Sequence, residues 1–282
     1  MRIVIIGNGA AGNEAAETIR KYDDAVELLM ISAETFPLYS ACALPDCISG
    51  WVSREQLFLK DSKDYAQQNI ETVFGARVIE IDKTKKQVLL EKSMLDYDRL
   101  IIATGSRGFI PPVAGAKLPG NFLIKSVRDV DHIEEHRPSR VVVVGSGNIG
   151  VEAAEALEMR GCEVTLIELA QRVMPKAFDE KPSLLLRQLL ENNGIKVCTN
   201  EQVLAIDGIN SVNGVITDKQ KIPCDTVIWA VGVRQNTELA SKAGIDIGRL
   251  GGIKVNSRME TSQEDIYACG DCIETFDLIS KE

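Results

Sequence analysis

The stretch that decides the fold of this 282-residue chain is Arg2-Ile3-Val4-Ile5-Ile6-Gly7-Asn8-Gly9-Ala10-Ala11-Gly12. Its first half is a short, apolar, β-branched run that predicts a buried strand, and its second half is a glycine-rich turn. The Ala- and Glu-rich residues 13–22 then predict a helix, and a second apolar run over residues 26–31 completes a β-α-β unit. Glycines at this spacing allow a tight turn, a close approach of the backbone to a pyrophosphate, and close packing of helix on strand.

The same pattern returns at residue 140. Four consecutive valines, Val141–Val144, precede Gly145-Ser146-Gly147-Asn148-Ile149-Gly150, and residues 151–160 and 164–168 predict the next helix and strand. A single GxGxxG is a weak signal, and its glycines can be plain turn residues. Here both copies follow a strand, open a helix and lead to a second strand. We therefore predict an α/β fold with two Rossmann-like dinucleotide-binding domains.

Two acidic residues follow the loops at the distance, about 20 residues, at which a carboxylate accepts hydrogen bonds from a ribose diol. They are Glu34 and Glu168. Glu168 directly ends its strand, which favours NAD over NADP because a carboxylate repels a 2′-phosphate, although Arg172 nearby leaves this preference open. Ser32 stands where the first unit would carry its acid, so a surface role for Glu34 stays an alternative.

Outside the two units, apolar runs that end in small residues predict further strands. Residues 100–106 and 226–232 each reach a glycine turn, and residues 266–271 end in Gly-Asp. Alternation over residues 72–82 and 87–91 predicts a small antiparallel excursion. Two consecutive prolines exclude a helix within residues 108–120, which we expect to form the crossing between the domains.

The composition is that of an ordinary globular protein, with 45% hydrophobic residues, 26% charged residues and a net charge of −9. The acidic balance argues against binding nucleic acid, because there is no basic surplus to neutralise phosphates. No apolar run approaches the roughly 20 residues of a membrane helix, and the apolar start is too short for a signal peptide. We therefore expect a cytoplasmic protein whose seven cysteines do not form a disulfide framework.

Two patterns resemble metal sites, and we expect neither to bind a metal. Cys269-Gly270-Asp271-Cys272 is half of a zinc site, and the chain has no second C-x2-C. His132-Ile133-Glu134-Glu135-His136 matches a zinc-peptidase pattern but lies in a charged segment typical of a solvated helix.

Taken together, these motifs resemble the FAD- and NAD(P)-dependent pyridine nucleotide-disulfide oxidoreductases along nearly the whole chain. Besides the two loops, Ala103-Thr104-Gly105 matches the end of a strand in the FAD domain, and Tyr267–Asp271 resembles the second FAD motif. Residues 230–237 are similar to the family's A-x-G-x-R-P-N-T, with Gln235 in place of the proline. The resemblance implies an FAD-binding domain formed by residues 1–109 and 240–282, into which an NAD-binding domain, residues 110–239, is inserted.

The resemblance also implies which residues bind each cofactor. For FAD they are Gly7, Gly9, Ala10, Ala11, Gly12, Glu34, Ala103, Thr104, Gly105, Gly270 and Asp271. For NAD(H), which we expect in preference to NADP(H), they are Gly145, Gly147, Asn148, Ile149, Gly150, Glu168 and Gly232.

One cysteine segment points to redox chemistry. Tyr39-Ser40-Ala41-Cys42-Ala43-Leu44-Pro45 is similar to the S-x-x-C-A-L-P segment of coenzyme A-disulfide reductases and related NADH oxidases and persulfide reductases, although Ala41 replaces their common Asn. The resemblance implies that Cys42 is the redox residue beside the flavin. A small buried cysteine with no catalytic role is the alternative. Cys47 has C-x4-C spacing to Cys42, and the sequence leaves its participation open.

The expected activity is that of an FAD-dependent NADH oxidoreductase that passes electrons through the flavin and Cys42 to a small disulfide, a persulfide or O2. Two alternatives remain: an NADH-dependent reductase of a small redox protein, similar to rubredoxin or nitrite reductases, with Cys42 silent, or a non-catalytic nucleotide-binding subunit. The resemblance further implies that a C-terminal dimerisation domain is missing. We expect a homodimer only if such a domain exists.

Overall fold

The computed structural model describes residues 1–276, and these residues form two compact units. Unit 1 contains residues 1–39, 58–107 and the described residues from 234 onward, and unit 2 contains residues 40–57 and 108–233. The chain therefore leaves unit 1 and returns to it twice. Residues 277–282, which end the predicted FAD-binding domain, lie outside the described residues.

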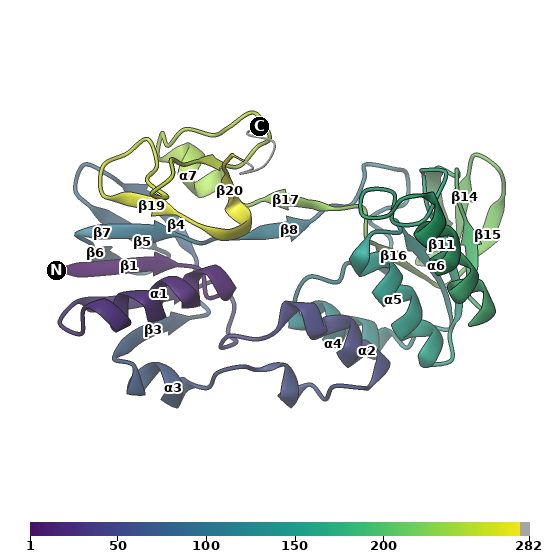
Figure 1. Cartoon of the computed structure of the whole chain (residues 1–282), viewed down its shortest axis with the longest axis horizontal. Helices are drawn as coiled ribbons and strands as arrows, with labels where there is room; N and C mark the ends of the chain where they lie inside the picture. Colours follow the sequence, from purple (N-terminus) through teal and green to yellow (C-terminus); the bar gives the residue numbers. More distant parts are fainter. Residues whose placement is uncertain (277–282) are drawn as a thin grey trace. The chain divides into compact units, whose positions relative to one another are not determined.

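Unit 1 is built on a five-stranded parallel sheet (Figure 1). In sheet order its strands are β3 (Ile70–Phe74), β2 (Glu27–Ser32), β1 (Arg2–Ile6), β7 (Arg99–Ile102) and β19 (Ile266–Ala268). In the central strand β1, Val4 and Ile6 belong to one hydrophobic cluster, and Ile3 and Ile5 belong to another. The sheet is thus packed on both faces, which is why the sequence of β1 is continuously apolar.

Unit 2 is built on a second five-stranded parallel sheet. In sheet order its strands are β12 (Lys196–Cys198), β11 (Glu163–Ile167), β10 (Arg140–Val144), β16 (Thr226–Trp229) and β9 (Asn121–Phe122). In both units the strand before the glycine loop lies between the next strand of its β-α-β unit and a later strand, all parallel. This is the strand order of a dinucleotide-binding sheet, and it confirms the predicted fold class.

Each unit also carries a three-stranded antiparallel sheet. Its strands are β4 (Val78–Asp82), β5 (Gln87–Leu90) and β6 (Met94–Asp96) in unit 1, and β13 (Val203–Gly208), β14 (Val212–Thr217) and β15 (Lys221–Pro223) in unit 2. The antiparallel excursion predicted over residues 72–82 and 87–91 is confirmed for β4 and β5. It is wrong for residues 72–74, which lie in β3 and pair in parallel with β2. As an edge strand, β3 is only partly buried, so its alternation imitates an antiparallel strand.

Helices connect these strands. In unit 1 they are α1 (Ala10–Tyr22), α3 (Ser62–Gln67), α7 (Glu238–Lys242) and the 3-10 turn η3 (Gly270–Cys272). In unit 2 they are η1 (Ala41–Ala43), α2 (Leu44–Ser49), η2 (Glu55–Leu57), α4 (Val127–His136), α5 (Asn148–Met159) and α6 (Glu180–Asn192). The remaining short strands are β8 (Ser106–Gly108), β17 (Val233–Gln235), β18 (Ile253–Lys254) and β20 (Ile273–Glu274). The helices α1 and α5 begin inside the glycine motifs, earlier than the predicted starts at residues 13 and 151.

The segment 40–57, which carries Cys42, packs with unit 2, whereas the sequence assigns it to the first domain. Four of the six residues of α2 are buried, and α2 packs against α4 and α5. Farther along the segment, Arg54 makes a two-pronged ion pair with Asp131 of α4, with N–O distances of 2.6 and 2.9 Å. Helix packing and this ion pair therefore hold the cysteine segment in place.

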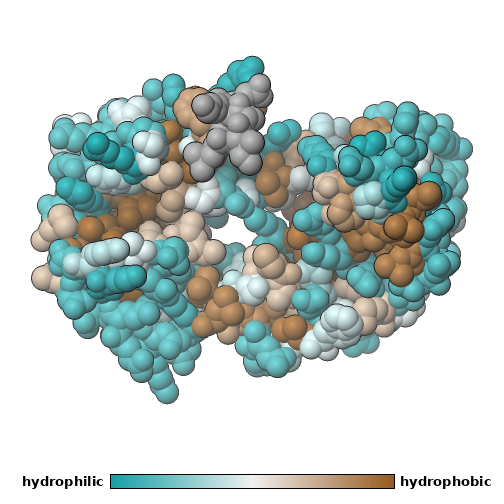
Figure 2. Space-filling model, in the orientation of Figure 1, coloured by the Kyte–Doolittle hydropathy of each residue, from teal (hydrophilic) through white to brown (hydrophobic). Residues whose placement is uncertain are grey.

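The surface shows where side chains of each kind gather. Figure 2 shows hydrophilic colouring over most of the visible face, and hydrophobic colouring over the part of unit 2 where α6 runs. In α6, Leu184, Leu185 and Leu189 are exposed, while Ser183 and Leu190 are buried. Within residues 1–276, no helix has the length and apolar character needed to cross a membrane.

Candidate functional site

The two glycine loops share one geometry at their first glycine. Gly7 and Gly145 have positive φ angles of 121° and 99°. A Cβ atom on either would collide with a carbonyl oxygen, that of Ala103 for Gly7 and that of Ala230 for Gly145. Each alanine follows the strand next to the loop, β7 or β16, so the loop crosses the end of that strand at contact distance. This contact explains why the first residue of each loop is a glycine.

The third glycine of each loop is also required by the protein's own packing. A Cβ atom on Gly12 would overlap the carbonyl oxygen of Gly7, and one on Gly150 would overlap that of Gly145. Both glycines are buried under the first turn of the following helix. They are therefore needed whether or not a ligand binds.

The middle glycine differs, because the protein itself does not require it. Gly9 and Gly147 are exposed and have ordinary φ angles of −79° and −72°. Among the described residues, a Cβ atom on either would meet nothing within 4 Å. Open space therefore lies beside the backbone at the point where a dinucleotide-binding loop meets its pyrophosphate.

The two helices that follow have bare N-termini. Gly9 and Gly147 are the N-caps of α1 and α5, and in the described chain neither helix has a side-chain cap or an acidic residue in its first turn. The first-turn N–H groups have no intrahelical acceptor. They belong to residues that the sequence predicts to bind a cofactor: Ala10, Ala11, Gly12, Asn148, Ile149 and Gly150. Such N–H groups, at the positive end of a helix dipole, suit a phosphate.

In unit 2 the predicted acid lies against the glycine loop. Glu168 follows β11 and is half-buried. The backbone N–H and the hydroxyl of Ser146 donate to its Oε2 atom over 2.8 and 2.6 Å, and the N–H of Ala170 donates to Oε1 over 2.8 Å. These donors fix the position of the carboxylate beside the glycine loop.

In unit 1 the predicted acid is held differently. Glu34 lies two residues beyond β2, and its carboxylate accepts a hydrogen bond from the Tyr39 hydroxyl over 3.1 Å. Ser32, at the end of β2, is buried, and its Oγ atom accepts from the N–H of Glu34 over 3.1 Å. Within the described part of the chain, the Glu34 side chain makes no hydrogen bond to the first glycine loop.

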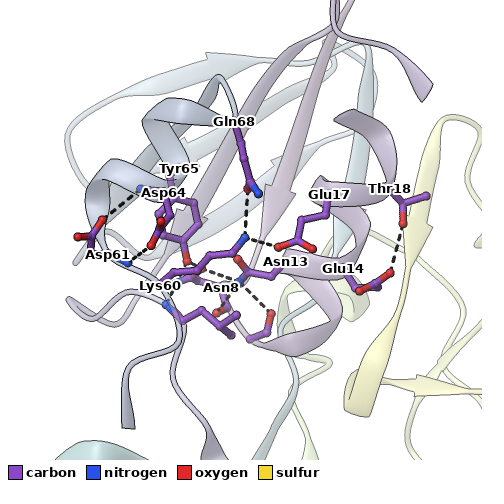
Figure 3. Close-up of polar contacts among 12 residues, drawn as sticks. Asn8, Asn13, Glu14, Glu17, Thr18, Lys60, Asp61, Asp64, Tyr65 and Gln68 are labelled. Carbon is purple, nitrogen blue, oxygen red and sulfur yellow. Dashed lines mark hydrogen bonds and ion pairs between the residues drawn. The ribbon is translucent and has the colours of Figure 1, made fainter. Parts of the chain in front are cut away.

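A buried polar network supports the first loop instead (Figure 3). The Tyr65 hydroxyl donates to Oδ1 of Asn8 over 2.8 Å and accepts from the N–H of Leu38 over 3.0 Å. Asn8 in turn donates through Nδ2 to the carbonyl of Phe36 over 3.0 Å, and Asn13 donates to Asn8 Oδ1 over 2.8 Å. Burial raises the pKa of Tyr65, so its hydroxyl remains a donor. The network ties the loop to the segment that follows β2.

One atom of this network is unsatisfied. Oδ1 of Asn13 is buried and has no hydrogen-bond donor among the described residues. A buried acceptor without a donor is uncommon in a folded protein. Together with the open space beside Gly9, it fits a loop whose surroundings include a ligand and its hydration.

The other motifs of unit 1 meet near the same loop. Ser106, in β8, donates to the carboxylate of Asp271 over 2.7 Å. Gly270 has a positive φ of 78°, and a Cβ atom on it would lie 2.6 Å from the Cβ atom of Ala11, in the first turn of α1. Gly270 and Asp271 are therefore brought to the N-terminus of α1, beside the predicted phosphate site.

The strand-ending motifs also make contacts of their own. The Thr104 hydroxyl donates to the carbonyl of Asn236 over 2.7 Å, and Nδ2 of Asn236 donates back to the carbonyl of Thr104 over 2.8 Å. Gly105, with a φ of 65°, accepts from the N–H of Asn236 over 3.0 Å. In unit 2, Gly232 has a φ of 111° and, within residues 1–276, nothing near its Cβ position.

The seven cysteines all lie in the described residues, and Cys42 is the exposed one. It lies in η1, just before α2. Cys47 lies on α2 and is buried, and burial, reinforced by the charge of Glu134, raises the pKa of its thiol. The two residues thus have opposite surroundings, one open to reagents and one a protonated packing residue. This arrangement favours Cys42 over Cys47 for thiol chemistry.

The residues of the two metal-like patterns take part in packing. Burial raises the pKa of Cys269 to about 11, and Cys272 is fully buried, with its Sγ donating to the carbonyl of Ile102 over 3.4 Å. His136 packs on Phe122, with their ring centroids 5.0 Å apart. Across residues 1–276, no group of three or more His, Cys, Asp or Glu side chains is placed to hold a metal ion.

Sequence reasoning missed several residues of these sites. Two of them contact a predicted cofactor-binding residue: Ser146 contacts Glu168, and Ser106 contacts Asp271. The other two, Asn8 and Tyr65, form the contact that supports the first glycine loop. A hydroxyl between two glycines is the one signal that marks Ser146. The Asn8–Tyr65 contact has no such signal, because it joins residues 57 positions apart.

Comparisons with known proteins agree with this geometry. A family profile described as pyridine nucleotide-disulphide oxidoreductase matches residues 1–281. The chain is 39% identical to an NADH oxidase of Methanocaldococcus jannaschii over 293 aligned positions, which cover 100% of the chain and 65% of that protein. It is 32% identical to an assimilatory nitrate reductase electron transfer subunit of Bacillus subtilis, with 97% of the chain and 36% of that protein covered.

A solved structure is similarly close. A NAD-dependent persulfide reductase from A. fulgidus superposes with a TM-score of 0.96 at 34% identity, covering 100% of this chain and 55% of that one. The chain spans less than two thirds of the length of each of these three relatives. The profile match over almost every residue, with two glycine loops of one geometry, shows that the chain belongs to the pyridine nucleotide-disulphide oxidoreductase family.

Proposed function

We propose that this chain is an NADH-dependent flavoprotein oxidoreductase, with FAD at the loop of unit 1 and NAD(H) at the loop of unit 2. The observation that carries the proposal is the open space beside Gly9 and Gly147, two glycines that the protein does not need for its own packing. The names of the relatives, an NADH oxidase and a NAD-dependent persulfide reductase, support the same class of reaction.

The residues of the chain supply binding and orientation. The bare N-termini of α1 and α5 would each receive a pyrophosphate, and Asp271, oriented by Ser106, would accept hydrogen bonds from hydroxyl groups of the FAD chain. Bound FAD supplies two-electron chemistry between the nicotinamide and an acceptor. The division into an FAD-binding and an NAD-binding domain is part of the proposal, and the predicted boundaries differ from those of units 1 and 2 chiefly at residues 40–57, which pack with unit 2.

NADH is the proposed coenzyme in preference to NADPH. The Glu168 carboxylate is held against the glycine loop by Ser146, so its negative charge would repel a 2′-phosphate. Arg172 is the nearby cation that could bind a 2′-phosphate and so weaken this preference. Its guanidinium donates to the carbonyls of Phe178 and Pro175 over 3.2 Å each, so it is engaged within its own loop.

The proposed electron acceptor is a small disulfide, a persulfide or O2, reached through Cys42. The exposure of Cys42 supports this role, and so does the persulfide reductase among the similar structures. The alternative acceptor is a small redox protein, with Cys42 silent. The electron transfer subunit among the relatives supports that alternative.

The test is an anaerobic titration of the FAD-loaded protein with NADH, followed by absorbance. We expect the flavin band to bleach with a stoichiometric amount of NADH, because both cofactors bind the same chain. Bound FAD that NADH does not bleach would contradict the proposal and favour a non-catalytic nucleotide-binding subunit.

The role of Cys42 is tested in the same titration. We expect a long-wavelength thiolate-to-flavin absorbance band in the reduced wild type, and its loss in Cys42→Ser. Cys162→Ser is the matched control, because it also removes one thiol, a half-buried one whose Sγ donates to the carbonyl of Pro138. Identical spectra for wild type and Cys42→Ser would favour the redox-protein alternative.

A further inference from the structure

The hydroxyl of Ser146 has no access to a ligand, yet it contacts the residue proposed to read the coenzyme. Ser146 lies between Gly145 and Gly147 and is fully buried. Its hydroxyl points to Glu168 and donates to Oε2 over 2.6 Å, and its own backbone N–H donates to the same oxygen over 2.8 Å. A hydroxyl hydrogen bond this short to a carboxylate oxygen is among the stronger side-chain hydrogen bonds in proteins.

The Ser146 hydroxyl also contacts the loop that follows Glu168. The N–H of Met174 donates to Ser146 Oγ over 3.2 Å and to the Ser146 carbonyl over 3.0 Å. The hydroxyl proton is therefore committed to Glu168, while its oxygen accepts from the loop. One side chain joins the glycine loop, the acid at the end of β11 and the loop after it.

The first glycine loop lacks this arrangement. Asn8 holds the position that Ser146 holds in the second loop, and its side chain bonds to Tyr65 and to the carbonyl of Phe36. Glu34 is held by Tyr39 instead. The contact between loop and acid is thus a property of unit 2 and not a general requirement of a glycine loop.

We propose that Ser146 sets the preference of this chain for NADH over NADPH, by fixing the Glu168 carboxylate beside the second glycine loop. The inference rests on the proposed function. A carboxylate has about four lone-pair sites, and the hydrogen bonds from Ser146 and Ala170 occupy three of them. The remaining capacity suits one ribose hydroxyl, whereas a 2′-phosphate brings only acceptors and negative charge. Ser146 is a positioning residue, because it acts through Glu168.

The test measures equilibrium binding of NADH and NADPH to the purified chain by calorimetry. We expect Ser146→Ala to weaken NADH binding about tenfold, because the Glu168 carboxylate is no longer held in place to accept a hydrogen bond from the ribose, and to change NADPH binding less than twofold. The preference ratio therefore falls about tenfold. Ser146→Gly removes the same hydroxyl in a residue that a glycine loop tolerates, and we expect the same fall.

Two further variants separate positioning from a structural role. In Glu168→Gln, adding Ser146→Ala should weaken NADH binding by less than twofold, because the partner is already altered. Thr226→Val is the matched control, since it removes a buried hydroxyl of the same sheet that donates to Asp225 over 2.7 Å. We expect it to leave the preference ratio unchanged.

Equal weakening of NADH and NADPH by Ser146→Ala and Ser146→Gly would overturn the inference, since it would mean that Ser146 serves only the phosphate loop. Additive effects in the double variant would also overturn it. A wild-type chain that binds neither coenzyme would overturn the proposed function itself. The two failures are therefore distinguishable.

Discussion

Gly9 and Gly147 are glycines that the fold does not require but that a bound dinucleotide would require. Their φ angles are ordinary and the space beside them is open, whereas Gly12 and Gly150 are packed against a carbonyl oxygen. An alanine methyl group at the open positions would occupy the space that the proposed pyrophosphates need. In each loop, the fold itself requires the third glycine, whereas only a bound ligand would require the middle one.

This contrast predicts opposite outcomes for two substitutions in unit 2. Gly147→Ala should weaken NADH binding about tenfold or more and change the free energy of unfolding by less than about 1 kcal/mol. Gly150→Ala should lower the free energy of unfolding by about 1–3 kcal/mol, because its methyl group collides with the backbone. Calorimetry and denaturant unfolding measure the two effects. Equal losses of stability in both variants would contradict the distinction.

The cysteines give a second prediction at this scale. Iodoacetamide should alkylate Cys42 rapidly and Cys47 slowly in the folded protein, because Cys42 is exposed while burial raises the pKa of Cys47. Peptide mass spectrometry at successive times reads both rates. Unfolding in denaturant should remove the difference. Similar rates before unfolding would mean that the α2 packing described above is wrong.

At the scale of elements, the ion pair between Arg54 and Asp131 ties the end of the cysteine segment to α4. The guanidinium of Arg54 lowers the pKa of Asp131, chiefly through their hydrogen bond. A carboxyl whose folded pKa is depressed adds stability that is present above its unfolded pKa and is lost as the pH falls through the folded value. The contribution of this partly exposed, two-pronged pair is about 1 kcal/mol at neutral pH.

Asp131→Asn should therefore lower the free energy of unfolding by about 1 kcal/mol at pH 7. The difference from wild type should stay constant down to about pH 5 and shrink as the pH falls below about 4. Denaturant unfolding across this range measures it. Asp129→Asn is not a suitable control, because Asp129 closes the capping box of α4. A difference that grows toward low pH would contradict the assignment.

At the scale of elements, part of the fold was predictable from the sequence and part was not. The β-α-β units were predictable, because apolar runs, glycine spacing and helix composition are all local. The membership of β3 in the parallel sheet was not, because an edge strand with one exposed face alternates like an antiparallel one. The contact of Ser146 with Glu168 and the packing of residues 40–57 with unit 2 depend on how distant segments meet. Local sequence patterns carry no information about contacts between segments that are distant in the sequence.

At the scale of the whole molecule, the chain contains one architecture twice. Each unit has a five-stranded parallel sheet, a glycine loop after its central strand, a small residue at the end of the neighbouring strand and a three-stranded antiparallel sheet. The units differ at the acid, which is held by Ser146 in unit 2 and by Tyr39 in unit 1. Two similar glycine loops with different acid environments support the proposal that the two units bind different dinucleotides.

In the proposed function, one chain binds two dinucleotides at separate sites. The most direct measurement is calorimetric binding of NADH to the chain already saturated with FAD, under anaerobic conditions, with the heat of reduction determined separately using dithionite-reduced protein. We predict that saturating FAD leaves one NADH site per chain with undiminished affinity. Competition between FAD and NADH, with the NADH affinity falling as the FAD concentration rises, would contradict it.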